Sequence, residues 1–384
     1  MTQPRTVIHL CSTGGFYGAE HTIIELAAYA RDHGWSSHVV ALEGDGAREL
    51  VRQASAEGLT ATAFVSSGRL NMIPMLKRLS SYLKAHPGAL VHSHGYKPDL
   101  LLSLPGISKT HIRVATCHSW YSVTRKLRAL ELADKRLLRS FHHVVAVSDE
   151  IRNELLASGV QGARLTTISN GISAPTVASN ARIKIKAELG IHENTRLLIQ
   201  VGRLASSKRN DILLMAFARS QLGRQCRLLF VGDGELRGTL QQLAKELGLA
   251  DHVAFCGYRS DVADLVAAAD LLVLSSDKEG LPIVLLEAMA IRCPIISTSV
   301  GAIPSTLRQG TDAWLVRAND VSGLSAALDE ALSDPREAHR RADNAYARYM
   351  DCFSRDSMGS NYLRIYDSLF NAHSPNSVLG PASR

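Results

Sequence analysis

The stretch Glu279-Gly-Leu-Pro-Ile-Val-Leu-Leu-Glu287 governs the interpretation of the whole chain. The apolar run 271–274 before it predicts a buried strand, and residues 275–278 predict the loop that leaves this strand. Pro282 suits the first turn of a helix, where its missing N–H costs nothing. Glu279 would then lie in the loop and Glu287 on the helix, at most about 12 Å further along at ~1.5 Å per residue.

The start of such a helix offers free backbone amides, which form a ready anion site. We expect this cradle to use the backbone around Gly280, Leu281, Pro282 and Ile283. A carboxylate, an anion site and a second carboxylate match, in order, the sugar hydroxyls, the diphosphate and the ribose hydroxyls of a nucleotide sugar. The alternative is a surface helix with acids at both ends, and this segment alone does not decide between the two.

A second loop supplies positive charge. The predicted strand 197–201 runs into Gly202-Arg203-Leu204 and, after a short turn, into Lys208. A close backbone approach with an Arg and a Lys is what a diphosphate needs. Strand 228–231 likewise runs into a loop that begins with Gly232, and strand 7–11 into a loop with Gly15. Every α/β protein has such loops, so the indication comes from their combination with the paired glutamates.

Both halves of the chain alternate short apolar strands with longer helical patterns, which is typical of parallel α/β sheets. The expected strands are 7–11, 37–42, 90–94, 114–116, 144–147 and 165–168, then 197–201, 227–231, 253–256, 271–274 and 295–298. Residues 173–180 read as a linker, residues 354–371 as a terminal helix, and residues 372–384 as a disordered tail. The candidate residues follow strand ends, where open α/β sheets bind ligands.

With these residues in view, the chain resembles the family four glycosyltransferases, the retaining group 1 enzymes of GT-B fold. The resemblance covers nearly the whole chain and also rests on the opening Gly14-Gly15…Glu20, on His118 after a strand, on Ala146-Val147-Ser148 and on Ser169-Asn170-Gly171-Ile172. Two departures stand out. Arg209 follows Lys208 where the family usually has Gly, and Ala302 and Ser305 replace the usual Gly and Glu.

The resemblance implies two Rossmann-like parallel α/β domains that face each other across a cleft. Residues 1–175 would bind the acceptor, with helix 354–371 packed back on them, and residues 176–353 would bind the donor. Glu279 would engage donor sugar hydroxyls and Glu287 the ribose, while Arg203 and Lys208 would act on the leaving group. His118 would orient the reacting sugar. The further donor-binding residues would be Gly15, Gly202, Gly232 and the 280–283 backbone.

The histidines of the first half have a simpler explanation as well. Eleven of the fifteen histidines lie there, so most must be structural, and this alternative stays open for His118. His92 and His94 are interpreted as structural or cleft-lining rather than as a metal pair. The chain has no Asp-x-Asp motif to tie a metal to a diphosphate, and we expect neither a metal nor any other cofactor.

Charge is unevenly distributed. Residues 1–173 hold 19 Lys+Arg against 13 Asp+Glu, whereas the remainder is nearly balanced. A helical pattern over 123–141 places five cations on one face, namely Arg125, Arg128, Lys135, Arg136 and Arg139. This face is either a solvated surface or a platform for an anionic membrane or a lipid pyrophosphate. Few aromatic residues and no nucleic-acid motif argue against nucleic acid.

The sequence therefore predicts a metal-independent, retaining hexosyltransferase that moves a sugar from a nucleoside-diphosphate sugar to a glycan or lipid-linked acceptor. By family analogy, bacterial surface polysaccharide or lipopolysaccharide assembly is the expected setting. The alternatives are a nucleotide-sugar 2-epimerase and a non-catalytic nucleotide-sugar-binding protein. Scattered cysteines, no signal peptide and no apolar run of ~18 residues favour a cytoplasmic protein, with peripheral attachment to the inner membrane face left open.

Overall fold

The computed structural model describes residues 5–12, 18–42, 46–64, 72–107, 111–118 and 125–373. The chain forms two compact units. The first comprises Met1–Ser173 and Cys352–Arg384, and the second comprises Ala174–Asp351. The units therefore meet at Ser173 and Ala174, two residues before the boundary expected from the sequence.

The first unit contains a seven-stranded sheet in the order β3-β2-β1-β4-β5-β6-β7, and every pairing is parallel. Its strands are β1 (Thr6–Ser12), β2 (Ser36–Leu42), β3 (Thr60–Phe64), β4 (Leu90–His94), β5 (Ile112–Cys117), β6 (His143–Ala146) and β7 (Leu165–Thr167). Its helices are α1 (Gly18–Asp32), α2 (Gly46–Ala56), α3 (Met72–Ala85), α4 (Tyr96–Leu102), α5 (Arg125–Leu138), α6 (Asp149–Ala157), the short η1 (Gly162–Arg164) and α15 (Arg355–His373).

The second unit contains a six-stranded parallel sheet in the order β10-β9-β8-β11-β12-β13. Its strands are β8 (Leu197–Val201), β9 (Arg227–Val231), β10 (Val253–Gly257), β11 (Leu271–Leu274), β12 (Ile295–Thr298) and β13 (Trp314–Val316). Its helices are α7 (Ala181–Glu188), η2 (Ser206–Lys208), α8 (Asn210–Arg219), η3 (Gly223–Gln225), α9 (Arg237–Glu246), α10 (Val262–Ala268), α11 (Ile283–Ile291), α12 (Ile303–Thr306), α13 (Val321–Ser333) and α14 (Pro335–Cys352).

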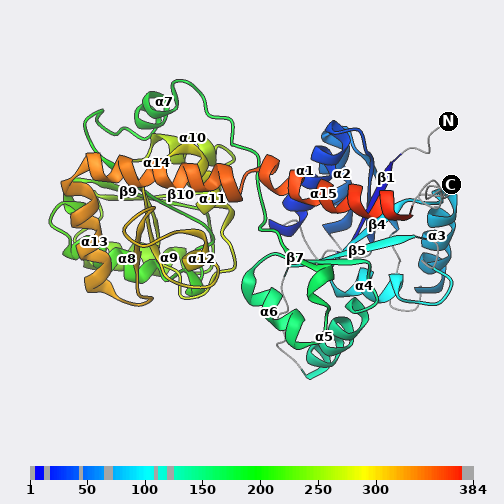
Figure 1. The fold of residues 1–384 in the computed structure, drawn as a ribbon. Coiled ribbons are helices and arrows are strands. Elements are labelled where there is room, and N and C mark those ends of the chain that lie inside the picture. Colours follow the sequence, from blue (N-terminus) through cyan, green and yellow to red (C-terminus); the bar gives the residue numbers. More distant parts are fainter. Residues whose placement is uncertain are drawn as a thin grey trace, which may run out of the picture. The chain divides into compact units, whose positions relative to one another are not determined.

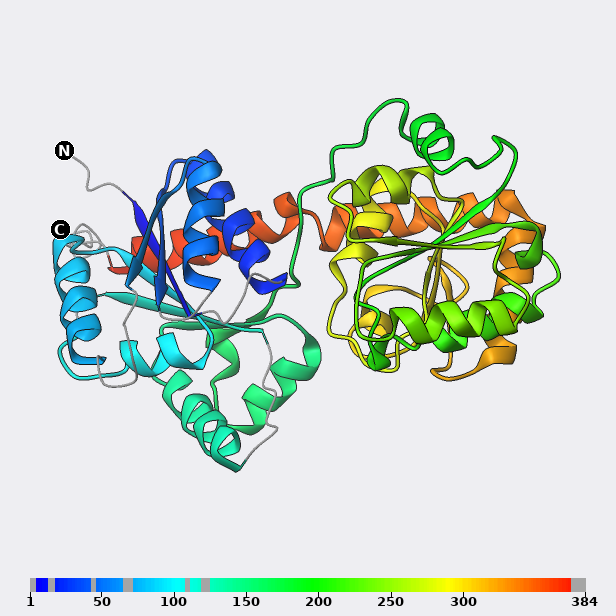
Figure 2. The ribbon, with the colours of Figure 1, turned by 180° about the vertical axis from the view of Figure 1, so that it is seen from behind.

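Helices cover both faces of each sheet (Figures 1 and 2). Parallel strands buried on both faces need nearly continuous apolar sequences, and β8 and β11 have them. All four residues of β11 are buried, as are the first four of β8. The two parallel sheets with flanking helices confirm the predicted α/β class.

The terminal helix α15 belongs to the first unit and lies against α1. Met358, Tyr362 and Tyr366 are buried in a core cluster shared with β1 and β4. Gly171, from the segment that carried the resemblance, sits where this helix begins. A Cβ at Gly171 would lie 2.5 Å from the carbonyl oxygen of Ser354, so only glycine fits there. The helix extends to His373, so Ala372 and His373, which were predicted to begin the disordered tail, are helical. The rest of the predicted tail, from residue 374 onward, lies outside the described residues.

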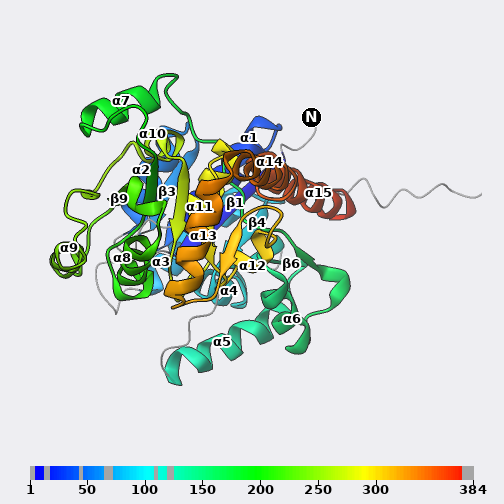
Figure 3. The same ribbon diagram turned by 90° about the vertical axis from the view of Figure 1, so that its left-hand side faces the viewer.

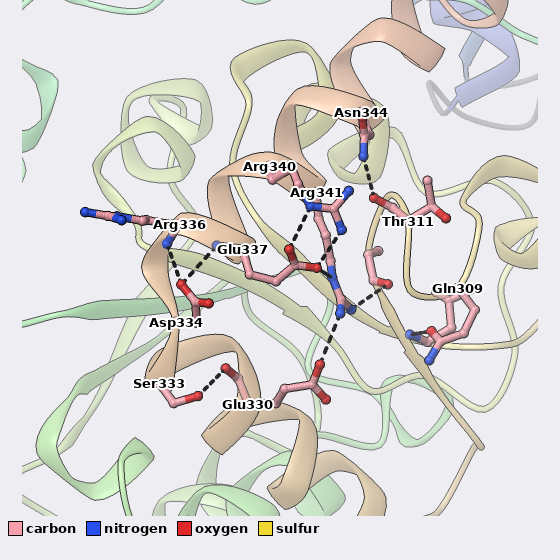
Figure 4. Close-up of polar contacts among 12 residues, drawn as sticks. Gln309, Thr311, Glu330, Ser333, Asp334, Arg336, Glu337, Arg340, Arg341 and Asn344 are labelled. Atoms are coloured by element: carbon pink, nitrogen blue, oxygen red, sulfur yellow. Dashed lines mark hydrogen bonds and ion pairs between the residues drawn. The ribbon is translucent and has the colours of Figure 1, made fainter.

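A buried arginine ties α14 to its neighbours in the second unit (Figure 4). The Arg341 guanidinium donates to Glu337 of the same helix at 2.7 Å and to Glu330 of α13 at 3.1 Å. It also lies 4.0 Å from the ring centroid of Trp314, on the edge strand β13. A buried charge is tolerated when it is paired and hydrogen-bonded in this way.

The sequence prediction missed two strands, β3 and β13. Each is the edge strand of its sheet, and each is only partly buried. Strand β3 alternates Thr with Ala and so lacks a continuous apolar run, whereas β13 is apolar but only three residues long. The other strands agree with the predicted positions within two residues at either end.

Candidate functional site

In the second unit, the loops that follow β8, β9 and β11 come together at the carboxyl edge of the sheet. Gly232, after β9, has a φ of 129°, and a Cβ there would lie 2.1 Å from the carbonyl oxygen of Gly202. The amide of Leu204 donates to Asp233 O at 3.0 Å and that of Leu236 to Leu204 O at 3.0 Å. The predicted Gly202 and Gly232 loops are thus packed backbone to backbone, which a larger residue at 232 would prevent.

Lys208 and Glu279 form an ion pair between the loops that follow β8 and β11. The hydroxyl of Ser276 donates to Glu279 Oε1 at 2.7 Å, and that of Ser275 donates to the carbonyl oxygens of Lys208 and Arg209 at 2.9 and 3.0 Å. The Lys208 side chain is 23% exposed and that of Glu279 10%. Two predicted charges are therefore held in fixed positions, largely shielded from solvent.

The loop before α12 packs against the backbone of Glu279. Gly301 has a φ of 54°, and a Cβ there would lie 1.9 Å from the carbonyl oxygen of Glu279. The amide of Ala302 donates to Gly280 O at 3.2 Å. The Ser305 side chain is exposed and donates to its own loop at Ala302 O. The departures at 302 and 305 thus leave the loop packed against the Glu279 segment.

Helix α11 begins at Ile283, so Pro282 directly precedes the first turn in an extended conformation and does not lie within that turn as predicted. Within the described part of the chain, no side chain caps this end of the helix. The amide of Leu285 donates to Pro282 O at 3.1 Å, so the amides of Ile283 and Val284 are the ones available to an anion. Glu287 lies on the same helix and is partly buried, and this burial raises the pKa of its carboxyl group above the usual value of 4.5.

Arg203 is less constrained than Lys208. Its side chain is 73% exposed and forms an ion pair with Glu235, at 3.2 Å, beyond the Gly232 loop. Surface pairs of this kind contribute little to stability, so the guanidinium can exchange Glu235 for another anion at small cost.

Arg209, which stands where the resemblance led us to expect glycine, adopts the left-handed conformation with φ 46° and ψ 44°. Such a conformation costs a non-glycine residue about 1–2 kcal/mol. Its guanidinium donates to both carboxylate oxygens of Asp211, at 3.1 and 3.0 Å, and to the side chain of Asn319. The loop therefore keeps the conformation suited to glycine, and the added charge is directed at Asp211.

In the first unit, His118 follows β5 and lies beside two histidines from neighbouring strands. His118 Nε2 is 3.4 Å from His94 Nδ1, and His94 Nε2 is 3.2 Å from His9 Nδ1. Burial lowers the pKa of His118 to about 4, with Glu20 acting weakly in the opposite direction. Burial also lowers the pKa of His9 to about 3 and that of His94 well below its usual value. These rings are neutral at pH 7. Gly15 falls outside the described residues.

His9, His92 and His94 form a group whose nitrogens lie within 4.8 Å of one another. His92, however, already uses both ring nitrogens: Nδ1 is 2.6 Å from the Tyr366 hydroxyl and Nε2 is 2.7 Å from Thr116 Oγ1. A metal would have to displace one of these partners. The geometry favours a hydrogen-bonded network over a three-histidine metal site.

Helix α5 carries the predicted basic face, with one change. Lys135 is not a free cation, because it pairs with Glu131 at 2.7 Å and with Glu154 of α6 at 2.9 Å. Helix α6 lies beside α5 (Figure 3). Arg128 and Arg136 are exposed, and so is Leu132, whose exposed fraction is 70%. Arg139 is exposed as well, but it follows the last residue of the helix, and its guanidinium donates to the carbonyl oxygen of Ser158. The side chain of Arg125 lies outside the described residues. The helix ends at Leu138, three residues before the predicted end.

Sequence reasoning missed His9 and Ser276. His9 lies in the middle of an apolar strand and has no motif around it, so its role depends on strand order. Ser276 was assigned only to a loop, although a hydroxyl three residues before a glutamate could have suggested the contact with Glu279.

Two family models match the chain: "Glycosyltransferase Family 4" over residues 16–174 and "Glycosyl transferases group 1" over residues 181–348. The N-acetyl-alpha-D-glucosaminyl L-malate synthase of Bacillus anthracis is 34% identical over 58% of this chain and 58% of its own length. The lipopolysaccharide core biosynthesis glycosyltransferase LpsE of Rhizobium meliloti is 30% identical over 48% of this chain and 53% of its own. The chain thus spans little more than half the length of either relative.

Among solved structures, the Anabaena HepE protein in complex with UDP superposes with a TM-score of 0.82 at 20% identity, covering 94% of this chain and all of HepE. HepE has also been crystallised with UDP-glucose. This likeness concerns the fold and agrees with the predicted GT-B class. Among the described residues, no helix is both long and apolar enough to cross a membrane.

Proposed function

We propose that this chain, which belongs to family 4 of the glycosyltransferases, transfers a hexose from a nucleoside-diphosphate sugar to a hydroxyl acceptor with retention of configuration. The observation that carries the proposal is the Lys208–Glu279 ion pair beside the uncapped start of α11. It supplies a cation for a leaving diphosphate next to a carboxylate that can accept hydrogen bonds from sugar hydroxyls.

Breaking the bond between sugar and diphosphate builds positive charge at the anomeric carbon and negative charge on the leaving oxygen. Lys208, Arg203 and the first-turn amides of α11 would stabilise the negative charge. Glu287 would accept hydrogen bonds from the ribose. Glu279 already binds Lys208 and Ser276, so it serves as an acceptor and a charge anchor rather than as a covalent nucleophile. The acceptor would attack on the face that the phosphate leaves.

For the donor we take UDP-sugars first, because HepE binds UDP and UDP-glucose. For the acceptor we propose a glycan or a lipid-linked glycan of surface polysaccharide or lipopolysaccharide assembly. The support is the relative LpsE, which is named as a glycosyltransferase of lipopolysaccharide core biosynthesis. The N-terminal unit would bind that acceptor, and His118 would orient the transferred sugar.

The rival enzyme is an epimerase of the same fold, which would release an altered nucleotide sugar without any acceptor. A thermal-shift panel of nucleotide sugars selects the donor, since a ligand at 100 times its Kd stabilises by ~2.7 kcal/mol. Incubation of the selected donor with candidate acceptors then decides the reaction. The proposal requires acceptor-dependent release of nucleoside diphosphate and a product with the donor's anomeric configuration, both visible by NMR. A changed nucleotide sugar formed without acceptor would establish the epimerase.

Chelation should leave the transfer rate unchanged. In this proposal Lys208 and Arg203 supply the charges for the leaving group, and the sequence has no Asp-x-Asp to hold a metal against the diphosphate. The measurement is the initial rate before and after dialysis against EDTA, with dialysis against buffer as the control. Complete loss of activity that magnesium or manganese restores would show that a metal takes part.

The exposed cations of α5 and Arg139, which follows the helix, should bring the protein to anionic membranes. Arg128, Arg136 and Arg139 are exposed, and Leu132 stands one helical turn from the first two of them. Each surface cation contributes about 1 kcal/mol toward an anionic bilayer, and salt weakens this attraction. We expect flotation with phosphatidylglycerol liposomes at low salt and its loss at high salt.

The variant Arg128→Ser, Arg136→Ser, Arg139→Ser should float poorly. A matched variant that removes three exposed cations of the second unit, Arg224→Ser, Lys245→Ser, Arg317→Ser, should float like the wild type. If wild type ignores anionic liposomes at low salt, or if both variants float equally well, the arginines of α5 form only a solvated face and the acceptor need not lie on a membrane.

A further inference from the structure

Three imidazole rings form a continuous hydrogen-bonded chain inside the first unit. The chain runs from His9 in β1 through His94 at the end of β4 to His118 after β5. Its two links measure 3.2 Å, between His9 Nδ1 and His94 Nε2, and 3.4 Å, between His94 Nδ1 and His118 Nε2. The parallel order β1-β4-β5 brings these three positions together.

The nitrogen atoms at both ends of this histidine chain lack hydrogen-bond partners. Among the described residues, His9 Nε2 and His118 Nδ1 are buried atoms without a hydrogen-bond partner. Buried polar atoms are nearly always paired, so two orphans at the ends of one chain need an explanation. His92 does not provide a partner, because its own nitrogens meet Tyr366 and Thr116.

The number of protons restricts how the chain can be arranged. Burial keeps all three rings neutral at pH 7, so each ring has one N–H and one lone pair. A ring that accepts at one nitrogen must then donate at the other. With both links made, all three N–H groups point the same way, and the chain has only two arrangements. Either His118 Nδ1 carries the terminal N–H and His9 Nε2 the lone pair, or the reverse.

The surroundings of the two ends favour the first arrangement. His9 is fully buried in the middle of a strand, where no ligand can reach it. His118 as a residue is partly exposed at the start of a loop, so a ligand can approach it, although its Nδ1 atom is covered in the unliganded structure. A buried N–H without an acceptor is rarer than an acceptor without a donor. The lone pair therefore belongs at His9, and the N–H belongs at His118, where an incoming oxygen can accept it.

We propose that His9 and His94 are positioning residues that fix His118 as a neutral hydrogen-bond donor at Nδ1, aimed at an oxygen atom of the bound substrate. His118 then holds the substrate by donating a hydrogen bond from Nδ1–H. It keeps the proton and does not act as a base. That the oxygen belongs to a hydroxyl of the transferred sugar rests on the proposed function. The tautomer itself does not depend on that identification.

The direct test is the tautomer of His118 in the unliganded wild-type protein. Nitrogen NMR distinguishes Nδ1–H, Nε2–H and the doubly protonated ring, and the His118→Gln variant assigns the signal. We expect the Nδ1–H tautomer at pH 7. The Nε2–H tautomer or a protonated ring would overturn the proposal. So would a stoichiometric bound metal lost from His9→Asn, because His9 Nδ1 and His94 Nε2 would then be metal ligands.

Two substitutions at His94, Asn and Asp, which match each other in shape, extend the test to function. In His94→Asn, the amide group can stand near the former Nδ1 and donate to His118 Nε2, so the Nδ1–H tautomer should persist with near-normal turnover. In His94→Asp, the carboxylate can only accept, so His118 should carry its proton on Nε2 and turnover should fall about tenfold or more. The control pair His142→Asn and His142→Asp changes a histidine of the same unit outside the chain, whose Nδ1 accepts from the Arg113 amide.

Equal turnover and an unchanged His118 tautomer in both His94 variants would overturn the positioning role, even in an active enzyme. If the wild type and His94→Asn show Nδ1–H and His94→Asp shows Nε2–H, the positioning role holds. It holds even if no nucleotide sugar is turned over, in which case the proposed function alone fails. The two failures are therefore distinguishable.

Discussion

Replacing Lys208 with alanine is expected to lower kcat by about 10²–10³-fold, the usual effect of removing one preorganised group from a developing negative charge. The Lys208 side chain is 23% exposed and is held by Glu279. The hydroxyl of Ser275 donates to the backbone carbonyl oxygen of Lys208 and so fixes the backbone there. A charge fixed in this way does not have to reorganise when the leaving group forms. The loss should therefore appear in kcat more than in the affinity for the donor.

Single-turnover rates with saturating donor measure this loss, and Lys245→Ala, which removes an exposed lysine of α9, controls for the change in net charge. Arg203→Ala should act in the same direction but less strongly, because its side chain is 73% exposed and is shared with Glu235. A near-normal rate for Lys208→Ala would mean that its ammonium group points away from the reacting phosphate.

The central strands of both sheets could be predicted because burial on two faces favours mainly apolar residues. Leu197–Val201, Leu271–Leu274 and Ile295–Thr298 agree with the prediction at both ends. The edge strand Thr60–Phe64 could not be predicted, because a single neighbouring strand relaxes that demand and its sequence alternates Thr with Ala. The edge strand Trp314–Val316 is apolar but only three residues long, too short to stand out. Trp314 is instead held by Arg341, a contact that no local pattern indicates.

The site divides in the same way. The order of carboxylate, helix start and carboxylate lies within nine consecutive residues, so the sequence alone displays it. The ion pair between Lys208 and Glu279 depends on β8 lying beside β11, although two strands separate them in the chain. The histidine chain likewise requires β4 between β1 and β5. Strand order depends on which arrangement of the complete sheet has the lowest free energy. Patterns in a single sequence contain little information about it.

Of the two variants Glu279→Ala and Glu287→Ala, only Glu287→Ala is expected to weaken the binding of UDP alone. Glu279 places a negative charge beside Lys208, so its removal frees the ammonium group for the diphosphate, and UDP should bind as well as before or more tightly. Glu287 would accept hydrogen bonds from the ribose. Hydrogen bonds to a charged group contribute about 1.5–3 kcal/mol, so its removal should weaken UDP binding by roughly ten- to a hundredfold. Turnover with the full donor should fall in both variants.

Isothermal titration of UDP into each variant separates these roles, with Glu246→Ala on the exposed surface of α9 as the matched control. The pH dependence of UDP binding provides a second test. Burial raises the pKa of Glu287, and only the ionised carboxylate accepts two hydroxyl donors. Wild-type affinity for UDP should therefore decline as the pH falls through that raised pKa, and Glu287→Gln should lack this part of the decline. Equal losses of UDP affinity in both alanine variants, or a pH profile that Glu287→Gln leaves unchanged, would show that the two glutamates do not divide sugar and ribose between them.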